Sequence, residues 1–375
     1  MSILDAHTRL LRALEAKHRR RALIPRAGID FASNDYLALA DSDELRDAAR
    51  AALDRGVPIG SGGSRLLRGN HAEHEALETE AATHFNAASA LFFSSGYAAN
   101  AALFASLPQR GDLIIHDELI HASVHEGMRL AKAETIAAAH NDAGAFAAAI
   151  ARWRGRGGKG RIWIAVESLY SMDGDRAQLA DLALLADRHE AFLVIDEAHA
   201  TGVFGPEGRG LAAELEGRDN VLTLHTLGKA LGCEGALVCG ARPLTDFLVN
   251  RGRGFIFSTA PSPLMAAVAR AAITLSRGDD RRRRLHALIA DAGALLADRF
   301  ACPRTGTQIV PLIFGDNFRT MRVAAYLQQK GFDVRGIRPP TVPEGTSRLR
   351  ISLTLNVGMA EVEALAAAID GALDA

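Results

Sequence analysis

The stretch Phe192-Leu193-Val194-Ile195-Asp196-Glu197-Ala198-His199 places four apolar residues directly before two carboxylates and a histidine. Four apolar residues in a row predict a strand that is buried on both faces, as in a parallel sheet covered by helices. A carboxylate at the end of such a strand costs free energy unless a cation, a protonated nitrogen or a metal ion lies beside it. Asp196 is therefore a candidate site residue.

Five further apolar runs surround this stretch and alternate with alanine-rich helical segments. The six runs together are 90–93, 113–116, 162–166, 192–195, 221–224 and 236–239. Such alternation is typical of an α/β fold with a mainly parallel sheet. Ligands of these sheets bind beyond the carboxyl ends of the strands, so the polar residues that follow the runs are the candidate site residues.

The 375 residues divide into three predicted parts. Residues 1–40 form an N-terminal arm, in which leucines at helical spacing predict an amphipathic helix. Residues 41–242 form the large α/β domain. Residues 243–375, where strand-like runs are sparser, form a smaller α+β domain.

The composition is that of an ordinary globular protein. Forty-three Lys and Arg against forty-four Asp and Glu give a formal net charge of −1, which disfavours general binding to nucleic acid or to an anionic membrane. No apolar run approaches the roughly 20 residues that span a bilayer. The N-terminus lacks the apolar block of a secretion signal, so we expect a cytoplasmic protein. Cys233, Cys239 and Cys302 lack paired spacing and predict ordinary thiols.

Two other polar segments follow predicted strands. Residues 94–97 precede a helical stretch, so that free backbone N–H groups and the positive end of a helix dipole would suit a phosphate group. Lys229 is enclosed by Gly228 and Gly232 with few charges nearby, which favours a neutral amine able to attack a carbonyl. Together with Asp196, these segments match the needs of pyridoxal phosphate, whose aldehyde forms an imine with a lysine and whose ring nitrogen needs an acidic partner.

Two alternative interpretations of these residues invoke a nucleotide or a metal ion. The run Asp196–His199 matches the DEAH signature of helicases, but no GxxxxGK sequence followed by serine or threonine occurs in the chain. His121 and His125 have the spacing of a helical zinc site, and His71 and His74 form a second pair, but neither pair has the rest of a zinc motif. We expect no metal, and interpret His121 as a flat ring lying over a flat cofactor. A non-catalytic cofactor-binding module remains an open alternative.

Two arginines lie on the same side of one predicted strand. Arg348 and Arg350 are two residues apart in the stretch 348–352, and side chains alternate along a strand. An arginine in this position can hold a carboxylate through two parallel hydrogen bonds. The alternative is a salt bridge between domains.

Seven segments of the chain resemble the α-oxoamine synthases, fold-type-I pyridoxal-phosphate enzymes that condense an amino acid with an acyl thioester and release carbon dioxide. The resemblance runs from about Phe31 to the C-terminus. The segments that carry it are 31–37 (FASNDYL), 60–65 (GSGGSR), 140–142 (HND), 171–175 (SMDGD), 196–199 (DEAH), 226–229 (TLGK) and 337–343 (IRPPTVP). The resemblance implies a large domain with a mainly parallel seven-stranded sheet flanked by helices, and a smaller C-terminal α+β domain.

The resemblance also implies roles for individual residues. Lys229, His121 and Asp196 are expected to be catalytic: Lys229 binds the cofactor aldehyde, Asp196 pairs with the ring nitrogen, and His121 stacks on the ring. The residues expected to contact the cofactor are Gly96, Tyr97, His121, Ser171, Asp196, His199, Thr226, Lys229, Ser258 and Thr259. Those expected to bind substrate are Arg21, Asn34, Thr341 and Arg350.

The forms of residues 60–64 and 337–343 favour, by the same resemblance, the family member that joins L-alanine to a pimeloyl thioester in biotin biosynthesis. The thioester is carried by coenzyme A or by an acyl carrier protein. Relatives that use glycine or serine, and make aminolevulinate, aminoketobutyrate or ketosphinganine, are the alternative. Because the family's active site lies at a dimer interface, we expect a homodimer in which Ser258 and Thr259 reach the phosphate bound by the other subunit.

Overall fold

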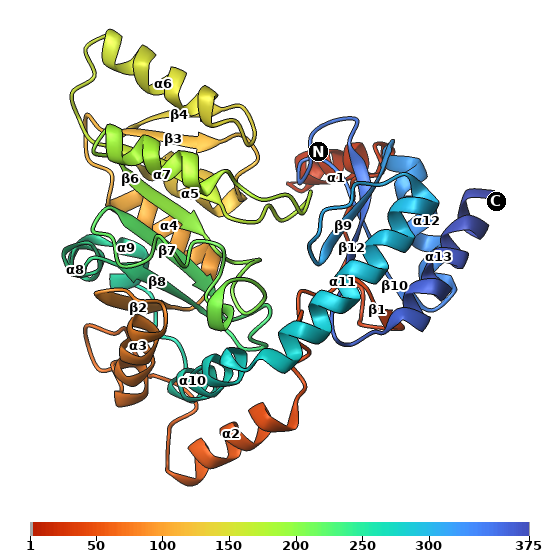
Figure 1. Cartoon of the computed structure of the whole chain (residues 1–375), viewed down its shortest axis with the longest axis horizontal. Helices are drawn as coiled ribbons and strands as arrows, with labels where there is room; N and C mark the ends of the chain where they lie inside the picture. Colours follow the sequence, from red (N-terminus) through yellow and green to blue (C-terminus); the bar gives the residue numbers. More distant parts are fainter. Residues whose placement is uncertain (1–2, 375) are drawn as a thin grey trace. The chain divides into compact units, whose positions relative to one another are not determined.

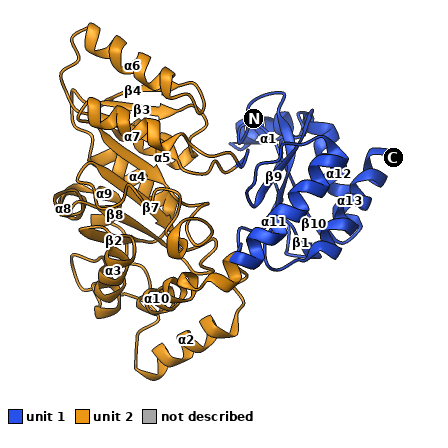
Figure 2. Ribbon diagram, viewed as in Figure 1, with its two compact units in different colours: residues 1–36, 172–174, 283–375 blue, residues 37–171, 175–282 orange. Residues whose placement is uncertain are grey.

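The computed structural model describes residues 3–374, which fall into two compact units (Figure 2). The larger unit comprises residues 37–171 and 175–282, and the smaller comprises residues 1–36, 172–174 and 283–375. These boundaries differ from the three predicted parts. The N-terminal residues group with the C-terminal ones because β1 (Ile29–Asp30) pairs with β10 (Phe332–Asp333). Residues 243–282 stay with the larger unit because α10 (Pro263–Arg277) packs against α2 (Asp43–Asp54) and α3 (Ala72–His84).

A seven-stranded sheet forms the centre of the larger unit, in the order β2-β8-β7-β6-β5-β3-β4 (Figure 1). Its strands are β2 (Ser89–Phe93), β3 (Leu113–Asp117), β4 (Glu134–Ala138), β5 (Ile162–Glu167), β6 (Phe192–Asp196), β7 (Val221–Thr226) and β8 (Ala236–Gly240). β8 is antiparallel to both its neighbours, and the other pairs are parallel. All six predicted runs form strands. β4 lacks an apolar run because it is an edge strand with three of its five residues exposed.

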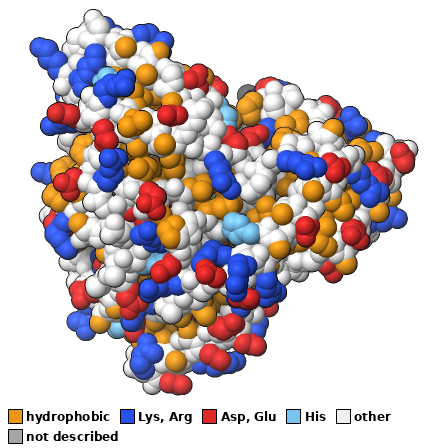
Figure 3. All heavy atoms as spheres, viewed as in Figure 1, with side chains coloured by type: hydrophobic (Ala, Val, Ile, Leu, Met, Phe, Trp, Pro, Cys, Tyr) orange, Lys and Arg blue, Asp and Glu red, His pale blue; other side chains and the backbone are white. Residues whose placement is uncertain are grey.

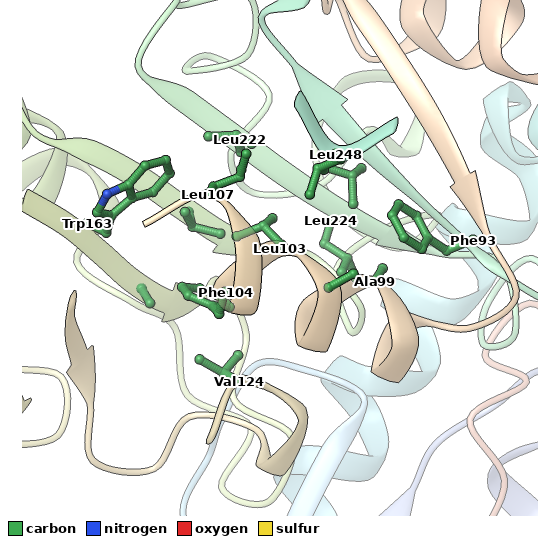
Figure 4. Close-up of a cluster of buried hydrophobic side chains, with 14 of the residues drawn as sticks. Phe93, Ala99, Leu103, Phe104, Leu107, Val124, Trp163, Leu222, Leu224 and Leu248 are labelled. Carbon is green, nitrogen blue, oxygen red and sulfur yellow. The ribbon is translucent and has the colours of Figure 1, made fainter. Parts of the chain in front are cut away.

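Helices cover both faces of this sheet, which is why its central strands are apolar throughout. Besides α10, the helices of the larger unit that follow β2 are α4 (Gly96–Ser106), α5 (Ala122–Leu130), α6 (Ala143–Gly155), α7 (Leu179–Arg188), η1 (Pro206–Gly208), α8 (Arg242–Arg251) and α9 (Arg253–Ile256). Successive residues of β5 point to opposite faces: Trp163 joins a core cluster beneath α4, and Ile164 joins a second cluster with α6 and α7. Figure 4 shows Leu103 and Phe104 of α4 packed in the first cluster. Because both faces are buried, polar side chains of this sheet gather at the strand ends.

The smaller unit contains a three-stranded antiparallel sheet in the order β11-β12-β9, as predicted for an α+β domain. The strands of this sheet are β9 (Ile309–Gly315), β11 (Arg335–Ile337) and β12 (Ser347–Ser352). The helices of the unit are α1 (Asp5–Ala16), α12 (Asn317–Gln329), α13 (Met359–Asp374) and, from residue 283 on, α11 (Asp279–Phe300).

The surface carries charges of both signs. Lysine and arginine side chains are interspersed with aspartate and glutamate on the face shown in Figure 3, consistent with the net charge of −1. Within residues 3–374, no helix is both long enough and apolar enough to cross a membrane.

Candidate active site

A cavity of about 200 Å³ lies at the carboxyl ends of β5, β6 and β7, next to the first turn of α4. Its lining residues are Gly96, Tyr97, Asn100, His121, Glu167, Asp196, Ala198, His199, Leu224, Thr226 and Lys229. Seven of the residues predicted to contact a cofactor are therefore brought together here from four separate segments. This is the strand edge at which parallel sheets bind their ligands.

Asp196, the last residue of β6, is held in place by hydrogen bonds to both carboxylate oxygens. The Asn100 side-chain amide donates to Oδ2 at 2.7 Å, and the Ala198 backbone N–H donates to Oδ1 at 2.9 Å. The side chain is buried, with 7% of the residue exposed. Donors of this kind stabilise the ionised carboxylate and fix its direction, so Asp196 can pair with a protonated nitrogen inside the cavity.

Lys229 lies in a tight turn that follows β7. The turn is closed by hydrogen bonds from Gly232 N–H to the Lys229 carbonyl and from Cys233 N–H to the Leu227 carbonyl, at 2.9 and 2.8 Å. Gly232 has φ +63°, and a Cβ there would lie 2.4 Å from the Ala40 nitrogen, so only glycine fits. The turn thereby directs Lys229 into the cavity.

The Lys229 amine contacts a histidine. Its Nζ lies 3.0 Å from His199 Nε2, and His199 is buried. One of these two nitrogens must accept the hydrogen bond from the other, so the two groups cannot both be fully protonated. The pair can therefore share a proton next to the cavity.

His121 is the N-cap of α5 and is neutral. Its Nδ1 accepts a hydrogen bond from the Ser123 N–H at 3.3 Å and lies 2.7 Å from Ser123 Oγ, so the ring proton is on Nε2. Burial lowers the pKa of His121, Lys229 lowers it further, and Asp196 partly opposes the shift. Ser123 Oγ also accepts a hydrogen bond from Asn100 at 3.0 Å, which links His121 to the partner of Asp196.

The start of α4 has the geometry predicted for a phosphate site. Ser95 caps the helix by accepting a hydrogen bond from the Ala98 N–H at 3.1 Å. Gly96 and Tyr97 form the first turn, where the backbone N–H groups have no partners inside the helix. Gly96 faces Thr226 of β7, because a Cβ at Gly96 would lie 3.9 Å from the Thr226 hydroxyl oxygen.

Three of the residues predicted to contact the cofactor do not line this cavity. Ser171 is buried behind it, and its N–H donates to Glu167 Oε2 at 3.1 Å. Ser258 and Thr259 follow α9 and are exposed, and the Ser258 hydroxyl donates to the Gly254 carbonyl at 2.6 Å.

Glu167, the last residue of β5, lines the cavity and was not predicted. It is 3% exposed, and its Oε1 has no hydrogen-bond partner among the described residues. Burial and the nearby Asp196 carboxylate raise the pKa of Glu167 to about 8, while Lys229 opposes the shift. Glu167 follows the run 162–166 as Asp196 follows 192–195, so the rule that selected Asp196 applies to it equally.

The four predicted substrate residues all belong to the smaller unit and form two connected pairs. Arg21 donates to the Thr341 hydroxyl at 2.8 Å. Tyr36 links the other pair: its hydroxyl donates to Asn34 Oδ1 at 2.9 Å and accepts from Arg350 Nη2 at 3.3 Å. The side chains of Tyr36 and Arg350 are buried.

The two arginines of β12 have different partners. Arg348 forms an ion pair with Asp173, which matches the salt-bridge alternative except that both residues belong to the smaller unit. Arg350 donates to the hydroxyls of Ser352 and Tyr36, at 2.7 and 3.3 Å. Of the two, Arg350 is the better candidate for a substrate carboxylate, because neutral hydroxyls compete for a guanidinium less strongly than a carboxylate does.

The cavity of the larger unit fits pyridoxal phosphate. It offers a buried carboxylate for the ring nitrogen in Asp196, an amine for the aldehyde in Lys229, and a helix N-terminus for the phosphate. His121 supplies a neutral aromatic ring. These four features define the class: a fold-type-I site built on the carboxyl edge of a parallel sheet.

Comparison with known proteins gives the family. The family model "Aminotransferase class I and II" matches residues 26–369. The chain is 42% identical to 8-amino-7-oxononanoate synthase of Anaeromyxobacter sp. strain K, over 97% of this chain and 94% of that protein. The chain therefore belongs to the class I and II aminotransferase family, in the group that contains the 8-amino-7-oxononanoate synthases, and it is a pyridoxal-phosphate-dependent enzyme.

Solved structures confirm the predicted fold class. A serine palmitoyltransferase from S. paucimobilis, with a pyridoxal phosphate–myriocin adduct bound, has a TM-score of 0.90 at 24% identity and covers 99% of this chain and 98% of that one. An 8-amino-7-oxononanoate synthase from Francisella tularensis has a TM-score of 0.76 at 26% identity, over 92% of this chain and 98% of that one.

Replacing Glu167 with glutamine should stabilise the cofactor-free protein more at pH 8 than at pH 5. The raised pKa means that the folded state resists ionisation of Glu167. The contribution of Glu167 to the free energy of unfolding is therefore full below about pH 4.5 and is lost as the pH rises toward 8. Glu167→Gln removes this loss. The free energy of unfolding that the variant gains at pH 8 should exceed the gain at pH 5 by on the order of 1 kcal/mol or more, since one unit of pKa corresponds to about 1.4 kcal/mol.

Denaturant unfolding at both pH values measures this difference. Glu214→Gln, at an exposed glutamate of the same unit, is the matched control and should show no such pH dependence. An equal effect of Glu167→Gln at the two pH values would contradict this prediction, because it would show that ionisation of Glu167 does not destabilise the folded protein.

Proposed function

We propose that the protein is an 8-amino-7-oxononanoate synthase, which condenses L-alanine with a pimeloyl thioester and releases carbon dioxide and the free thiol in biotin biosynthesis. The observation that carries the proposal is the gathering of Lys229, Asp196 and His121 around one cavity, in a chain similar over 97% of its length to a protein of that name. The name of that relative gives 8-amino-7-oxononanoate as its product, which is the product of joining alanine to a pimeloyl group with loss of carbon dioxide.

The residues of the cavity have separate tasks in this proposal. Pyridoxal phosphate, when bound, withdraws electrons from an amino acid attached to it and makes the α-proton acidic. Asp196 keeps the ring nitrogen protonated, and Lys229 Nζ accepts the α-proton. His199 Nε2 lies 3.0 Å from that amine and can accept a hydrogen bond from it once it is protonated. His121 stacks on the ring, and its Nε2–H donates to the oxygen that becomes negative when the thioester is attacked.

The residues of the smaller unit bind substrate in the proposal. Arg350 holds the alanine carboxylate through its planar guanidinium. Asn34 assists through Tyr36, which it contacts at 2.9 Å. Thr341 and Arg21, joined by a hydrogen bond of 2.8 Å, contact the acyl substrate.

The proposal includes a cytoplasmic homodimer with shared active sites. The support is the exposure of Ser258 and Thr259, which leaves both hydroxyl side chains accessible to a second copy of the chain. Ser171, buried behind Glu167, is assigned to the support of the cofactor site. The acyl carrier is coenzyme A or an acyl carrier protein.

A matrix of substrates tests the proposal. The purified enzyme with pyridoxal phosphate is incubated with alanine, glycine or serine against pimeloyl, acetyl, succinyl and palmitoyl thioesters, and pimeloyl is offered on both coenzyme A and a carrier protein. We expect the highest kcat/KM for alanine with a pimeloyl thioester. A preference for glycine or serine would overturn the assignment in favour of a relative with a different product.

Replacing Arg350 with alanine should weaken the binding of alanine and leave the cofactor bound. Losing hydrogen bonds to a charged group costs about 1.5–3 kcal/mol, so the KM for alanine should rise about 10- to 100-fold. Steady-state kinetics and the absorption spectrum of the bound cofactor measure the two effects.

The matched control is Arg335→Ala on the neighbouring strand, where Arg335 faces Arg350 in the register and pairs with Asp333. It should leave the KM for alanine within a factor of about three, because Arg335 is held by Asp333 and is not among the residues proposed to bind substrate. An unchanged KM in Arg350→Ala would contradict the role given to Arg350.

A further inference from the structure

His140 lies outside the cavity and contacts carboxylates from two different segments. Its Nδ1 is 2.8 Å from Asp117 Oδ1, and its Nε2 is 3.0 Å from Asp175 Oδ2. Ionised carboxylates only accept hydrogen bonds, so both ring nitrogens must carry hydrogen and the ring is an imidazolium. Asp117 is fully buried and also accepts from the backbone N–H groups of Leu119 and Asn141, at 2.8 and 2.7 Å.

The groups around His140 keep it charged. Burial opposes the charge, but the hydrogen bonds to Asp117 and Asp175 outweigh it and raise the pKa of His140 to about 10. Glu118 adds a third carboxylate, which accepts from the His140 backbone N–H at 3.0 Å. The Tyr170 ring packs edge-on against the imidazole, with centroids 4.5 Å apart. The ion pairs are therefore fully formed near neutral pH.

Asp175 belongs to the returning limb of a short hairpin. Leu169 and Arg176 form an antiparallel bridge across the hairpin, and the Tyr170 N–H donates to the Asp175 carbonyl at 2.9 Å. Asn141, the neighbour of His140, donates to Asp175 Oδ2 at 2.9 Å and to the Arg176 carbonyl at 2.8 Å. Asp117 at the end of β3 and the residues His140 and Asn141 after β4 thus hold the returning limb through their side chains.

The outgoing limb of the same hairpin reaches the cofactor cavity. It begins at Glu167, which lines the cavity, and continues to Ser171, whose N–H donates to Glu167 Oε2 at 3.1 Å. The Ser168 N–H donates to the Asp196 carbonyl at 2.9 Å, and the Ala177 N–H donates to the Ser168 carbonyl at 3.0 Å. A shift of the returning limb would therefore be transmitted to Glu167 and to the strand end that carries Asp196.

We infer that His140 is a positioning residue, which joins Asp117 to Asp175 and so fixes the hairpin that places Glu167 at the cofactor, with Ser171 behind it. His140 does not line the cavity, so it acts through its two carboxylate partners. The inference rests on the proposed function in one respect: the cavity beside Lys229 must be the cofactor site. It gives a role to the segment His140-Asn141, which the proposed reaction leaves unused.

The test compares cofactor affinity in the folded holoenzyme of four variants. His140→Gln keeps a hydrogen-bonding side chain and removes the charge, and Asp175→Asn removes the opposite charge with little change of shape. The double variant combines the two. His189→Gln, at a partly exposed histidine that caps the end of α7, is the control.

We expect each single variant to bind pyridoxal phosphate about tenfold more weakly. At metal sites, losing a residue that orients a ligand weakens binding by about 10- to 100-fold, and we expect the lower end of that range here. The absorption band of the bound cofactor should shift, because Glu167, which lines the cofactor cavity, is no longer held in a fixed position. The double variant should bind the cofactor no more weakly than the weaker-binding single variant, because the two substitutions break the same link between His140 and Asp175. His189→Gln should match the wild type. Near-ultraviolet circular dichroism checks that each variant is folded, and Asp175→Asn tests the link even if His140→Gln loses its fold.

The outcomes separate this inference from the proposed function. Wild-type affinity and spectrum in folded His140→Gln and Asp175→Asn would overturn the inference and leave the proposed function intact. Lower thermal stability with unchanged affinity would also overturn it, because that is the result of a purely structural role. Wild-type protein that does not bind pyridoxal phosphate would contradict the proposed function itself.

Discussion

The arrangement of the site depends on the burial of one carboxylate at the end of β6. The Asn100 amide and the Ala198 N–H each donate a hydrogen bond to one Asp196 oxygen and fix the direction of the carboxylate, and both donors are uncharged, so neither neutralises its charge. The neighbouring groups adjust to that charge. Glu167 ionises with difficulty beside it, whereas burial lowers the pKa of His121 although Asp196 opposes the shift, and the hydrogen bond from the Ser123 N–H leaves the ring proton on Nε2. A cofactor with a protonated ring nitrogen supplies the missing positive charge.

The framework behind this site could be predicted from the sequence because it depends on local patterns. Six buried strands are continuous apolar runs, and each was found where it was expected. The edge strand β4 could not be found in this way, since only one of its faces is covered and its residues include Glu134 and Thr135. The limits of the two units were also not predictable, because the pairing of β1 with β10 and the packing of α10 on α2 and α3 join residues far apart in the chain.

The site was predictable to the extent that its residues follow strands or begin helices. Asp196, Lys229 and Gly96 are of this kind, and they share one cavity with four others expected from the family resemblance. Glu167 obeys the same rule and was overlooked. Asn100 and Ser123 carry no signal by themselves: each is an ordinary polar residue of a helix, and its importance comes from a contact across the fold, at 2.7 Å for Asn100 and Asp196. Such contacts require knowledge of which helix faces which strand end.

Whether Lys229, beside Asp196, carries the cofactor can be measured directly, because the chain has few lysines. The chain contains five lysines: Lys17, Lys132, Lys159, Lys229 and Lys330. Reduction of the holoenzyme with borohydride, digestion and mass spectrometry identify the lysine that carries the cofactor. We expect one stoichiometric label, on the peptide that contains Lys229. Label on any other lysine, or none on the peptide of Lys229, would contradict this expectation.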